Sequence, residues 1–204
     1  MKITQVAGFL GCGKTALMLR LSRELAEDGK RKVALVVNEI GDIPVDGKII
    51  EESGMRMKEL GGGCICCEIA SSFARTIYEL YKEFHPDHVL VEPTGVAVPN
   101  QVKNVMRMAG RDAKIFVGPA IVLFDATRPA ELLDMDTLGR LVVTQVKDAD
   151  VIAISKVDAV DGAAVDESTL RVREFNTRAE VLNLSSFTGV GVDRLKEIIL
   201  TWEE

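Results

Sequence analysis

The sequence predicts an α/β fold, in which a mostly parallel central sheet carries helices on both faces. Short apolar runs rich in Val and Ile alternate with helical patterns along the chain, and this alternation is typical of parallel sheets that are covered on both sides. The first apolar run leads directly into a glycine-rich loop and then a helical pattern. No internal repeat, Pro-rich linker or low-complexity tract interrupts the pattern, so we expect residues 1–204 to form a single domain.

Strands are predicted at the apolar runs 2–7, 33–37, 89–91, 115–124, 151–154 and 181–184, and a further short strand is predicted at 55–59. The run 115–124 is interrupted by Gly118 and Pro119. Helices are predicted where apolar residues recur at helical spacing, as Phe73, Ile77 and Leu80 do: 15–28, 68–84, 100–108, 131–146, 163–176 and 192–202. In such folds ligands bind at the carboxyl ends of the strands, and each motif below follows a predicted strand or the segment after it.

Composition excludes several classes of function. The formal net charge is -6, and no long run of Lys and Arg is present, so nucleic acid is not expected as a main partner. No stretch of about 18 apolar residues could span a bilayer, and the first residues do not read as a signal peptide. We therefore expect a cytoplasmic protein without membrane contact, in which four cysteines do not form a disulfide framework.

The glycine loop, residues 8–15, satisfies the phosphate-binding pattern G-x-x-x-x-G-K-[ST] and so predicts a P-loop NTPase fold. Backbone N–H groups of such a loop turn inward around phosphate oxygens, and the following helix N-terminus adds favourable partial charge. Lys14 is expected to neutralise the β- and γ-phosphates, and the Thr15 hydroxyl to ligate Mg²⁺. The alternative, a glycine turn with an accidental lysine, does not explain why a strand precedes the loop and a helix follows it.

Two further segments would complete a nucleotide site. Glu92 ends a buried run, where P-loop proteins place an acidic Mg²⁺ partner, and the Gly95 N–H is open to a γ-phosphate. A carboxylate at a strand end is common in loops without a metal. The magnesium role of Glu92 is therefore predicted only in combination with the phosphate-binding loop upstream. Lys156 and Asp158, in the sequence SKVD, suit guanine. Asp158 would accept hydrogen bonds from the base, which adenine cannot donate, and the Lys156 stem would lie along the ring.

Guanine-reading segments usually have Asn where this chain has Ser155, which leaves base specificity open. Ser186 lies in SSFTG, which follows the last predicted strand and is placed like the final purine-contacting loop. We therefore expect GTP to be preferred to ATP.

Three cysteines, Cys64, Cys66 and Cys67, follow three consecutive glycines. Thiolates bind Zn²⁺ and other borderline-soft cations, and three donors leave a fourth position for exchange or for a partner's ligand. Buried inert cysteines or a redox pair are the alternatives. His85 and His88 lie in a helix-to-strand turn and are expected at the surface rather than as ligands.

The ordered set GFLGCGKT, NEIGD, GGGCICC, EPTG, SKVD and SSFTG resembles the CobW-type GTPases, relatives of the UreG and HypB metal-insertion GTPases, over essentially the whole chain. The resemblance implies a GTP- and Mg²⁺-dependent metallochaperone or metal-insertion factor for zinc or cobalt, with nickel also possible. A metalloprotein client and a nucleotide-dependent homodimer are implied as well. Many CobW-type proteins continue into a C-terminal domain beyond the point where this chain ends, at Glu204.

The resemblance also assigns roles to residues. It implies that the phosphates are held by Gly11, Cys12, Gly13, Lys14, Thr15 and Ala16. Asp42, in the NEIGD segment, would assist Mg²⁺ or the attacking water and act with Lys14 in catalysis, and Glu92 would complete the magnesium site. Lys156 and Asp158 would read the base, and the three clustered cysteines would hold the transition metal.

The cysteines lie between two segments expected to sense the γ-phosphate, so we expect GTP to organise the thiolates and hydrolysis to loosen them. No arginine finger is recognisable, which predicts slow turnover. A metal-buffering or sensing module with incidental hydrolysis, and a P-loop small-molecule kinase, are the alternative functions.

Overall fold

The computed structural model describes residues 1–28, 30–37, 55–59, 68–109, 115–128, 133 and 137–203. Within these ranges seven strands form one sheet in the order β3-β2-β4-β1-β5-β6-β7, and every pair of neighbours is parallel. The strands are β1 (Lys2–Gly8), β2 (Val33–Val37), β3 (Met55–Glu59), β4 (His88–Glu92), β5 (Phe116–Asp125), β6 (Val151–Ser155) and β7 (Glu180–Leu184). The predicted α/β fold with a parallel sheet is confirmed.

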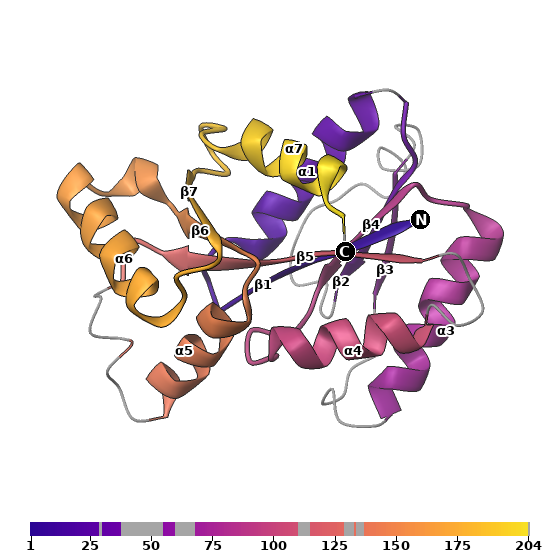
Figure 1. The fold of residues 1–204 in the computed structure, drawn as a ribbon. Coiled ribbons are helices and arrows are strands. Elements are labelled where there is room, and N and C mark those ends of the chain that lie inside the picture. Colours follow the sequence, from indigo (N-terminus) through magenta and orange to yellow (C-terminus); the bar gives the residue numbers. More distant parts are fainter. Residues whose placement is uncertain are drawn as a thin grey trace.

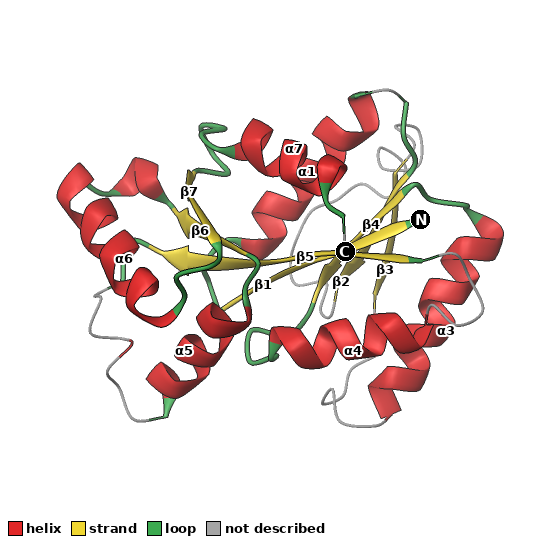
Figure 2. Cartoon of the chain, in the orientation of Figure 1, coloured by secondary structure: helices red, strands yellow, loops and turns green. Residues whose placement is uncertain are grey.

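Helices cover both faces of the sheet (Figure 1). They are α1 (Lys14–Glu27), α3 (Glu68–Glu83), α4 (Pro99–Ala109), α5 (Leu138–Asp148), α6 (Gly162–Phe175) and α7 (Val192–Thr201), with a short 3-10 helix η3 (Val157–Ala159) after β6. Helices α1 and α7 pack on one face. The other face is covered by α3 and α4 over one half of the sheet and by α5 and α6 over the other half. Figure 2 shows the helices outside the strands.

The strands β2 and β6 are apolar because both of their faces are buried. All five residues of β2 are buried, and Leu35 packs with the α1 cluster while Ala34 and Val36 pack with the α3 and α4 cluster. The same holds for β6, where Ala153 faces α1 and Ile152 faces α5. Successive side chains point to opposite faces of the sheet, and both faces are buried under helices. For this reason the sequence shows unbroken apolar runs at these strands and not an alternation of apolar and polar residues.

The structure corrects three details of the sequence prediction. The expected interruption at Gly118 and Pro119 is a register shift inside one continuous strand, since Ile3 pairs with Val117 but Gln5 pairs with Ala120. A Cβ at Gly118 would lie 2.4 Å from Thr4 Oγ1, so glycine permits this close approach.

Helix α5 begins at Leu138, not at residue 131; residues 129–132 and 134–136 lie outside the described part. His88, expected at the surface, is instead the buried first residue of β4.

The chain reverses its direction of travel across the sheet at β1. From β1 it goes to β2 on one side, and from β4 it passes over β1 to β5 on the other. The carboxyl ends of β1, β4 and β5 therefore flank a topological switch point, the usual place for a ligand in this architecture. No helix in the described part of the chain is long and apolar enough to cross a membrane.

Candidate functional site

The P-loop joins β1 to α1 at the switch point. Gly11 and Gly13 have φ of +76° and +95°, a left-handed conformation that glycine adopts without strain. Gly13 is the N-cap of α1 and no side chain caps the helix there, so the first N–H groups of α1 are available to a ligand. Such a helix N-terminus, preceded by turned-in glycines, suits a phosphate group. The exposed residue Ala16 lies in this first helical turn.

Lys14 supplies a buried positive charge to the loop. Its exposed fraction is 6%, and its Nζ donates a long hydrogen bond of 3.4 Å to the carbonyl oxygen of Phe9. Among the described residues no carboxylate lies within 4.0 Å of this ammonium group. A buried charge without a counter-ion is costly, and an anionic ligand such as a phosphate would supply the missing partner.

Thr15 and Glu92 bring the P-loop and the end of β4 together. Thr15 Oγ1 donates a hydrogen bond of 2.7 Å to Glu92 Oε2. Burial raises the pKa of the Glu92 carboxyl, although the Thr15 hydrogen bond and the Lys14 charge act in the opposite direction. A hydroxyl and a carboxylate side by side, next to a phosphate loop, are the oxygen ligands that Mg²⁺ takes in P-loop proteins. Both predicted magnesium ligands that the structure describes therefore fit the ion.

The segment after Glu92 lies against the P-loop. A Cβ at Gly95 would come within 2.9 Å of the Leu10 side chain, so a larger residue here would have to displace Leu10 of the loop. The carbonyl oxygens of Gly95 and Ala97 accept hydrogen bonds of 3.0 and 2.9 Å from the buried Gln145 Nε2 of α5. Gly95, predicted to approach a γ-phosphate, is thus placed beside the phosphate loop and is tied to α5.

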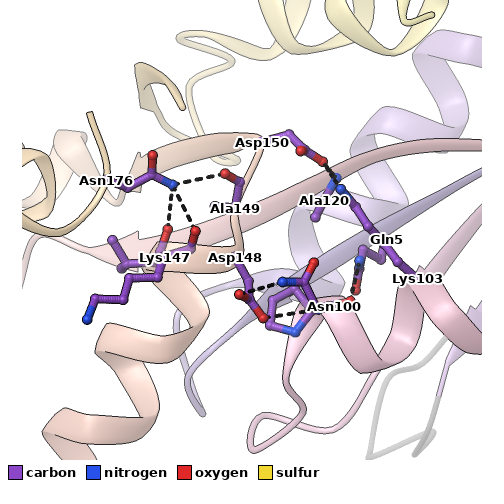
Figure 3. A network of polar contacts seen from close by, with 11 residues as sticks. Gln5, Asn100, Lys103, Ala120, Lys147, Asp148, Ala149, Asp150 and Asn176 are labelled. Carbon is purple, nitrogen blue, oxygen red and sulfur yellow. Dashed lines mark hydrogen bonds and ion pairs between the residues drawn. The ribbon is translucent and has the colours of Figure 1, made fainter. Parts of the chain in front are cut away.

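Helix α4, which continues from this segment, is anchored at its N-terminus (Figure 3). Gln5 Nε2 donates to the Pro99 carbonyl oxygen at 3.0 Å. Asn100 donates to the Asp148 carboxylate through both its backbone N–H and its side chain. Lys103 pairs with Asp150 at 2.5 Å. These contacts attach the start of α4 to β1, to the end of α5 and to the start of β6.

Ser155, the departure from the usual Asn, has a defined role in the fold. Its hydroxyl is buried and donates to the carbonyl oxygens of Cys12 at 3.0 Å and Phe124 at 3.3 Å. The last residue of β6 therefore holds the P-loop directly. Cys12 is buried beneath the loop, and burial raises the pKa of its thiol, so this cysteine is a packed thiol and not a thiolate.

Asp125, at the end of β5, is a site residue that the sequence analysis missed. It is 5% exposed, and its carboxylate accepts hydrogen bonds from the backbone N–H and hydroxyl of Thr127 and pairs with Lys156 Nζ at 2.7 Å. Burial alone would raise the pKa of the Asp125 carboxyl, but Lys156 and then Thr127 outweigh it and lower that pKa. Its place after a buried apolar run, like that of Glu92, was the available signal.

Arg128 extends this network to the P-loop. Its guanidinium lies 3.5 Å from the Asp125 carboxylate, donates a hydrogen bond to the Leu10 carbonyl oxygen and sits 5.0 Å from the Phe9 ring centroid. An arginine is therefore present beside the phosphate loop, although the sequence showed no recognisable finger.

The predicted base-reading residues lie at the carboxyl ends of β6 and β7. Lys156 has a left-handed φ of +61° and opens η3, in which Asp158 is exposed. Ser186 follows β7, and its carbonyl oxygen accepts a hydrogen bond of 3.1 Å from Arg20 of α1. Strands β6 and β7 are neighbours, with Ser155 opposite Leu184, so both segments leave the same edge of the sheet.

Comparison with known proteins places this arrangement in a family. Residues 2–183 match the family described as CobW/HypB/UreG, nucleotide-binding domain. The chain belongs to the CobW/HypB/UreG family. The zinc chaperone CobW of Sinorhizobium sp. is 29% identical over 210 residues, which cover 88% of this chain and 58% of that protein. The zinc chaperone YeiR of Escherichia coli (strain K12) is 32% identical over 154 residues, 75% of this chain and 45% of that protein.

Solved structures agree on the fold. The Zn(II)-bound YjiA GTPase of E. coli matches with a TM-score of 0.63 and 27% identity, over 89% of this chain and 56% of that one. The hydrogenase maturation factor HypB from Archaeoglobus fulgidus matches with a TM-score of 0.70 and 19% identity, over 97% of this chain and 87% of that one. The chain spans about half the length of the curated relatives that it matches.

Four predicted site residues of this CobW/HypB/UreG domain, namely Asp42, Cys64, Cys66 and Cys67, lie outside the described residues. Within the described ranges no group of three or more His, Cys, Asp or Glu side chains could hold a metal ion. The predicted thiolate site and the predicted catalytic role of Asp42 therefore stay predictions.

Proposed function

We propose that this domain binds and hydrolyses GTP with Mg²⁺ and that it delivers a transition metal, Zn²⁺ first among the candidates, to a metalloprotein. The observation that carries the nucleotide part is the 2.7 Å contact between Thr15 and Glu92 beside the buried Lys14, whose ammonium group has no carboxylate partner among the described residues. It supports a site for a divalent cation bridged to phosphates at the switch point of the sheet.

In this proposal each residue of the loop has a definite task. The N–H groups of residues 11–16 and the Lys14 ammonium hold the β- and γ-phosphates, with Cys12 contributing its backbone only. Thr15 and Glu92 hold Mg²⁺, which offsets the negative charge that develops on the phosphates. Gly95 offers its N–H to the γ-phosphate. Asp42 assists the ion or orients the attacking water. With no second subunit or partner supplying further charge, turnover is slow.

Guanine is the expected base because Asp158 is an exposed carboxylate that forms no hydrogen bond or ion pair with the other described residues. It can accept from the N1–H and 2-amino groups of guanine, and an adenine base would leave it unpaired. Ser186 and its loop complete the base subsite from the neighbouring strand.

The metal part of the proposal rests on Cys64, Cys66 and Cys67 and on the relatives named zinc chaperones. Three thiolates form an incomplete site from which Zn²⁺, Co²⁺ or Ni²⁺ can be handed on. The cysteines lie between residues 38–46 and residues 92–95 in the sequence, so GTP and metal affinity would be coupled reciprocally. A nucleotide-dependent homodimer, a protein client and a cytoplasmic location belong to the same proposal.

Calorimetry tests both parts. Mg²⁺-GTP should bind the wild type much more tightly than Mg²⁺-ATP, and Lys14→Ala should lose most of this affinity. Zn²⁺ is then titrated into the protein with a non-hydrolysable GTP analogue, with GDP and without nucleotide, and a variant with Ser at all three clustered cysteines is the control.

Different Zn²⁺ affinities in the nucleotide states, abolished in the Ser variant, are the expected result. Equal Zn²⁺ affinities would contradict metal delivery and support the buffering alternative. A preference for ATP with transfer of phosphate to a small molecule would support the kinase.

A further inference from the structure

The loop after β7, residues 185–189, presents one large aromatic side chain to solvent. Phe187 is 88% exposed, more than any other large apolar side chain in the described part of the chain. A phenyl ring in this state contributes nothing to the core. Burying it against a ligand would remove most of its surface from water, which is favourable.

The backbone that carries this ring is nevertheless firmly held. Ser185 is fully buried, its N–H donates to the Val190 carbonyl oxygen, and its hydroxyl accepts from the Thr188 N–H. The Gly189 N–H closes the turn on the Ser185 carbonyl oxygen at 2.9 Å. Loop tips without a function need no such order, because fixing a residue costs conformational entropy.

Arg20 adds a long-range tether to the same loop. Its Nη1 donates to the carbonyl oxygens of both Ser186 and Phe187, each at 3.1 Å, while its Nε pairs with Glu24 at 3.1 Å. Gly189 has a φ of +95°, and a Cβ there would collide with the Arg20 guanidinium. Arg20 lies on α1, the helix that begins at the P-loop, so one helix positions both the phosphate loop and this turn.

The place of this loop in the sheet suits the binding of a flat ligand. Residues 185–189 leave the sheet beside Lys156 and Asp158, because β6 and β7 are parallel neighbours with Ser155 opposite Leu184. A purine has two faces and an edge. Lys156 would cover one face with its aliphatic stem while Asp125 holds its ammonium group at 2.7 Å, and Asp158 would meet the edge. Phe187 is the one aromatic residue in the segments 155–158 and 185–189, so it is the candidate to cover the second face of the purine.

We propose that Phe187 forms the second wall of the base subsite by stacking on the purine, and that Arg20 is the positioning residue that holds it there. The inference rests on the proposed nucleotide binding and specifies how the base is held. Stacking is tolerant of base identity, since every base has a π-face. Phe187 therefore adds affinity for any purine nucleotide, and Asp158 provides the choice of guanine.

Binding of GDP, inosine diphosphate and tripolyphosphate to purified variants tests the proposal. Phe187→Ala should weaken GDP binding about 10- to 100-fold, the range seen when a stacked aromatic is removed. Inosine diphosphate should weaken by the same factor, because stacking does not read the 2-amino group, and tripolyphosphate should bind unchanged. Leu170→Ala, which truncates a 69% exposed side chain of α6, is the matched control and should change none of these affinities.

Tryptophan fluorescence gives a second readout. Phe187→Trp should change its emission when GDP binds, whereas Leu170→Trp should not, and this control also accounts for the native Trp202. In the Phe187→Trp background, Arg20→Ala should abolish the change and Arg20→Lys should restore part of it, since an ammonium group can still donate to a carbonyl oxygen. A purely structural role for Arg20 would lower thermal stability and leave the emission change intact.

The outcomes separate the inference from the proposed function. If the wild type binds GDP and Phe187→Ala binds it equally well, the stacking role is wrong and nucleotide binding stands. A Phe187→Ala variant that alters only the oligomeric state would also overturn the inference, because the ring would then serve a protein contact. If the wild type binds no guanine nucleotide, both proposals are wrong.

Discussion

The fold removes three ionisable side chains from most of their contact with water: Lys14, Glu92 and Asp125. They differ in how far neighbouring groups compensate their charge. Asp125 is paired with Lys156 and hydrogen-bonded by Thr127, so the protein satisfies it without a ligand. Among the residues that the structure describes, the Lys14 ammonium has one long hydrogen bond, and burial raises the pKa of the Glu92 carboxyl. Asp125 therefore stabilises the fold, while Lys14 and Glu92 are the residues whose charges a nucleotide and its cation would satisfy.

Replacing Glu92 should separate stability from function. Its raised pKa means that the ionised carboxylate disfavours folding at neutral pH. Glu92→Gln should therefore raise the unfolding temperature of the nucleotide-free protein by about 1–4 °C at pH 7. The gain should vanish below the ordinary Glu pKa, where the wild-type carboxyl is protonated as well.

The same variant should lose the stabilisation that Mg²⁺-GTP gives the wild type. Thermal scans with and without ligand measure both effects, with the exposed Glu167→Gln as control. A variant that is less stable without ligand would contradict the pKa argument.

Replacing Asp125 should have the opposite effect on folding. Asp125→Asn leaves the Lys156 ammonium without its partner, so the free energy of unfolding should fall by about 1–3 kcal/mol at pH 7. Because the folded-state pKa of this carboxyl is lowered, its contribution is present at neutral pH and is lost as the pH falls through that lowered value. Urea unfolding at pH 7 and at several pH values below the ordinary Asp pKa of 3.8 measures how this deficit shrinks, and the exposed Asp166→Asn should show no deficit at any pH.

At the scale of helices and strands, the sequence predicted what depends on local pattern and missed what depends on neighbours. Buried strands such as β2 and β6 were recognised because both faces are covered and every residue is apolar. The register shift at Gly118 was not, because it results from Thr4 on the adjacent strand. Likewise the roles of Ser155 and Arg20 depend on carbonyl groups 143 and 166 residues away, which no spacing rule could reveal.

The candidate site divides in the same way. The P-loop, Glu92 and the SKVD segment were found because each motif lies at a strand end that local sequence identifies. Asp125 was missed because a single acidic residue after an apolar run has no distinctive spacing. Only the pairing of β5 with β6, which sets Asp125 opposite Ser155, brings it to Lys156.

His88 makes the start of β4 sensitive to acid. Burial, followed by the charges of Lys2 and Arg31, lowers the pKa of its imidazole to about 4 from 6.5. Between about pH 6.5 and pH 4 this histidine is protonated in the unfolded chain but neutral in the folded protein. The free energy of unfolding should therefore fall as the pH is lowered through this range. The slope is at most about 1.4 kcal/mol per pH unit for one proton.

His88→Asn should flatten this slope, while the exposed His85→Asn, at a left-handed position that Asn tolerates, should retain it. Unfolding by urea at several pH values decides. Equal slopes in the wild type and His88→Asn would rule out this histidine as the source.

At the scale of the whole molecule, the first strand and the last helix are joined. Lys2 opens β1 in the middle of the sheet, and its Nζ donates to the carbonyl oxygens of Ile199, Leu200 and Trp202 at 2.9, 3.1 and 2.9 Å. Figure 1 shows the two ends of the chain close together. The last carbonyl groups of a helix have no hydrogen-bond partners within the helix. A cation at this end also interacts favourably with the partial negative charge of the helix dipole. One side chain thus links segments almost 200 residues apart.

Lys2→Met should show whether residues 1–204 unfold as a single cooperative domain, as the sequence predicts. Loss of three hydrogen bonds from a charged donor should lower the free energy of unfolding by about 1–3 kcal/mol. If α7 and the sheet form one unit, the urea midpoint falls with an unchanged m-value in fluorescence and in circular dichroism alike. Lys147→Met, which removes an exposed lysine of α5, is the matched control and should leave the midpoint in place. Faster amide exchange confined to α7, with an unchanged midpoint, would instead show that the last helix opens independently of the sheet.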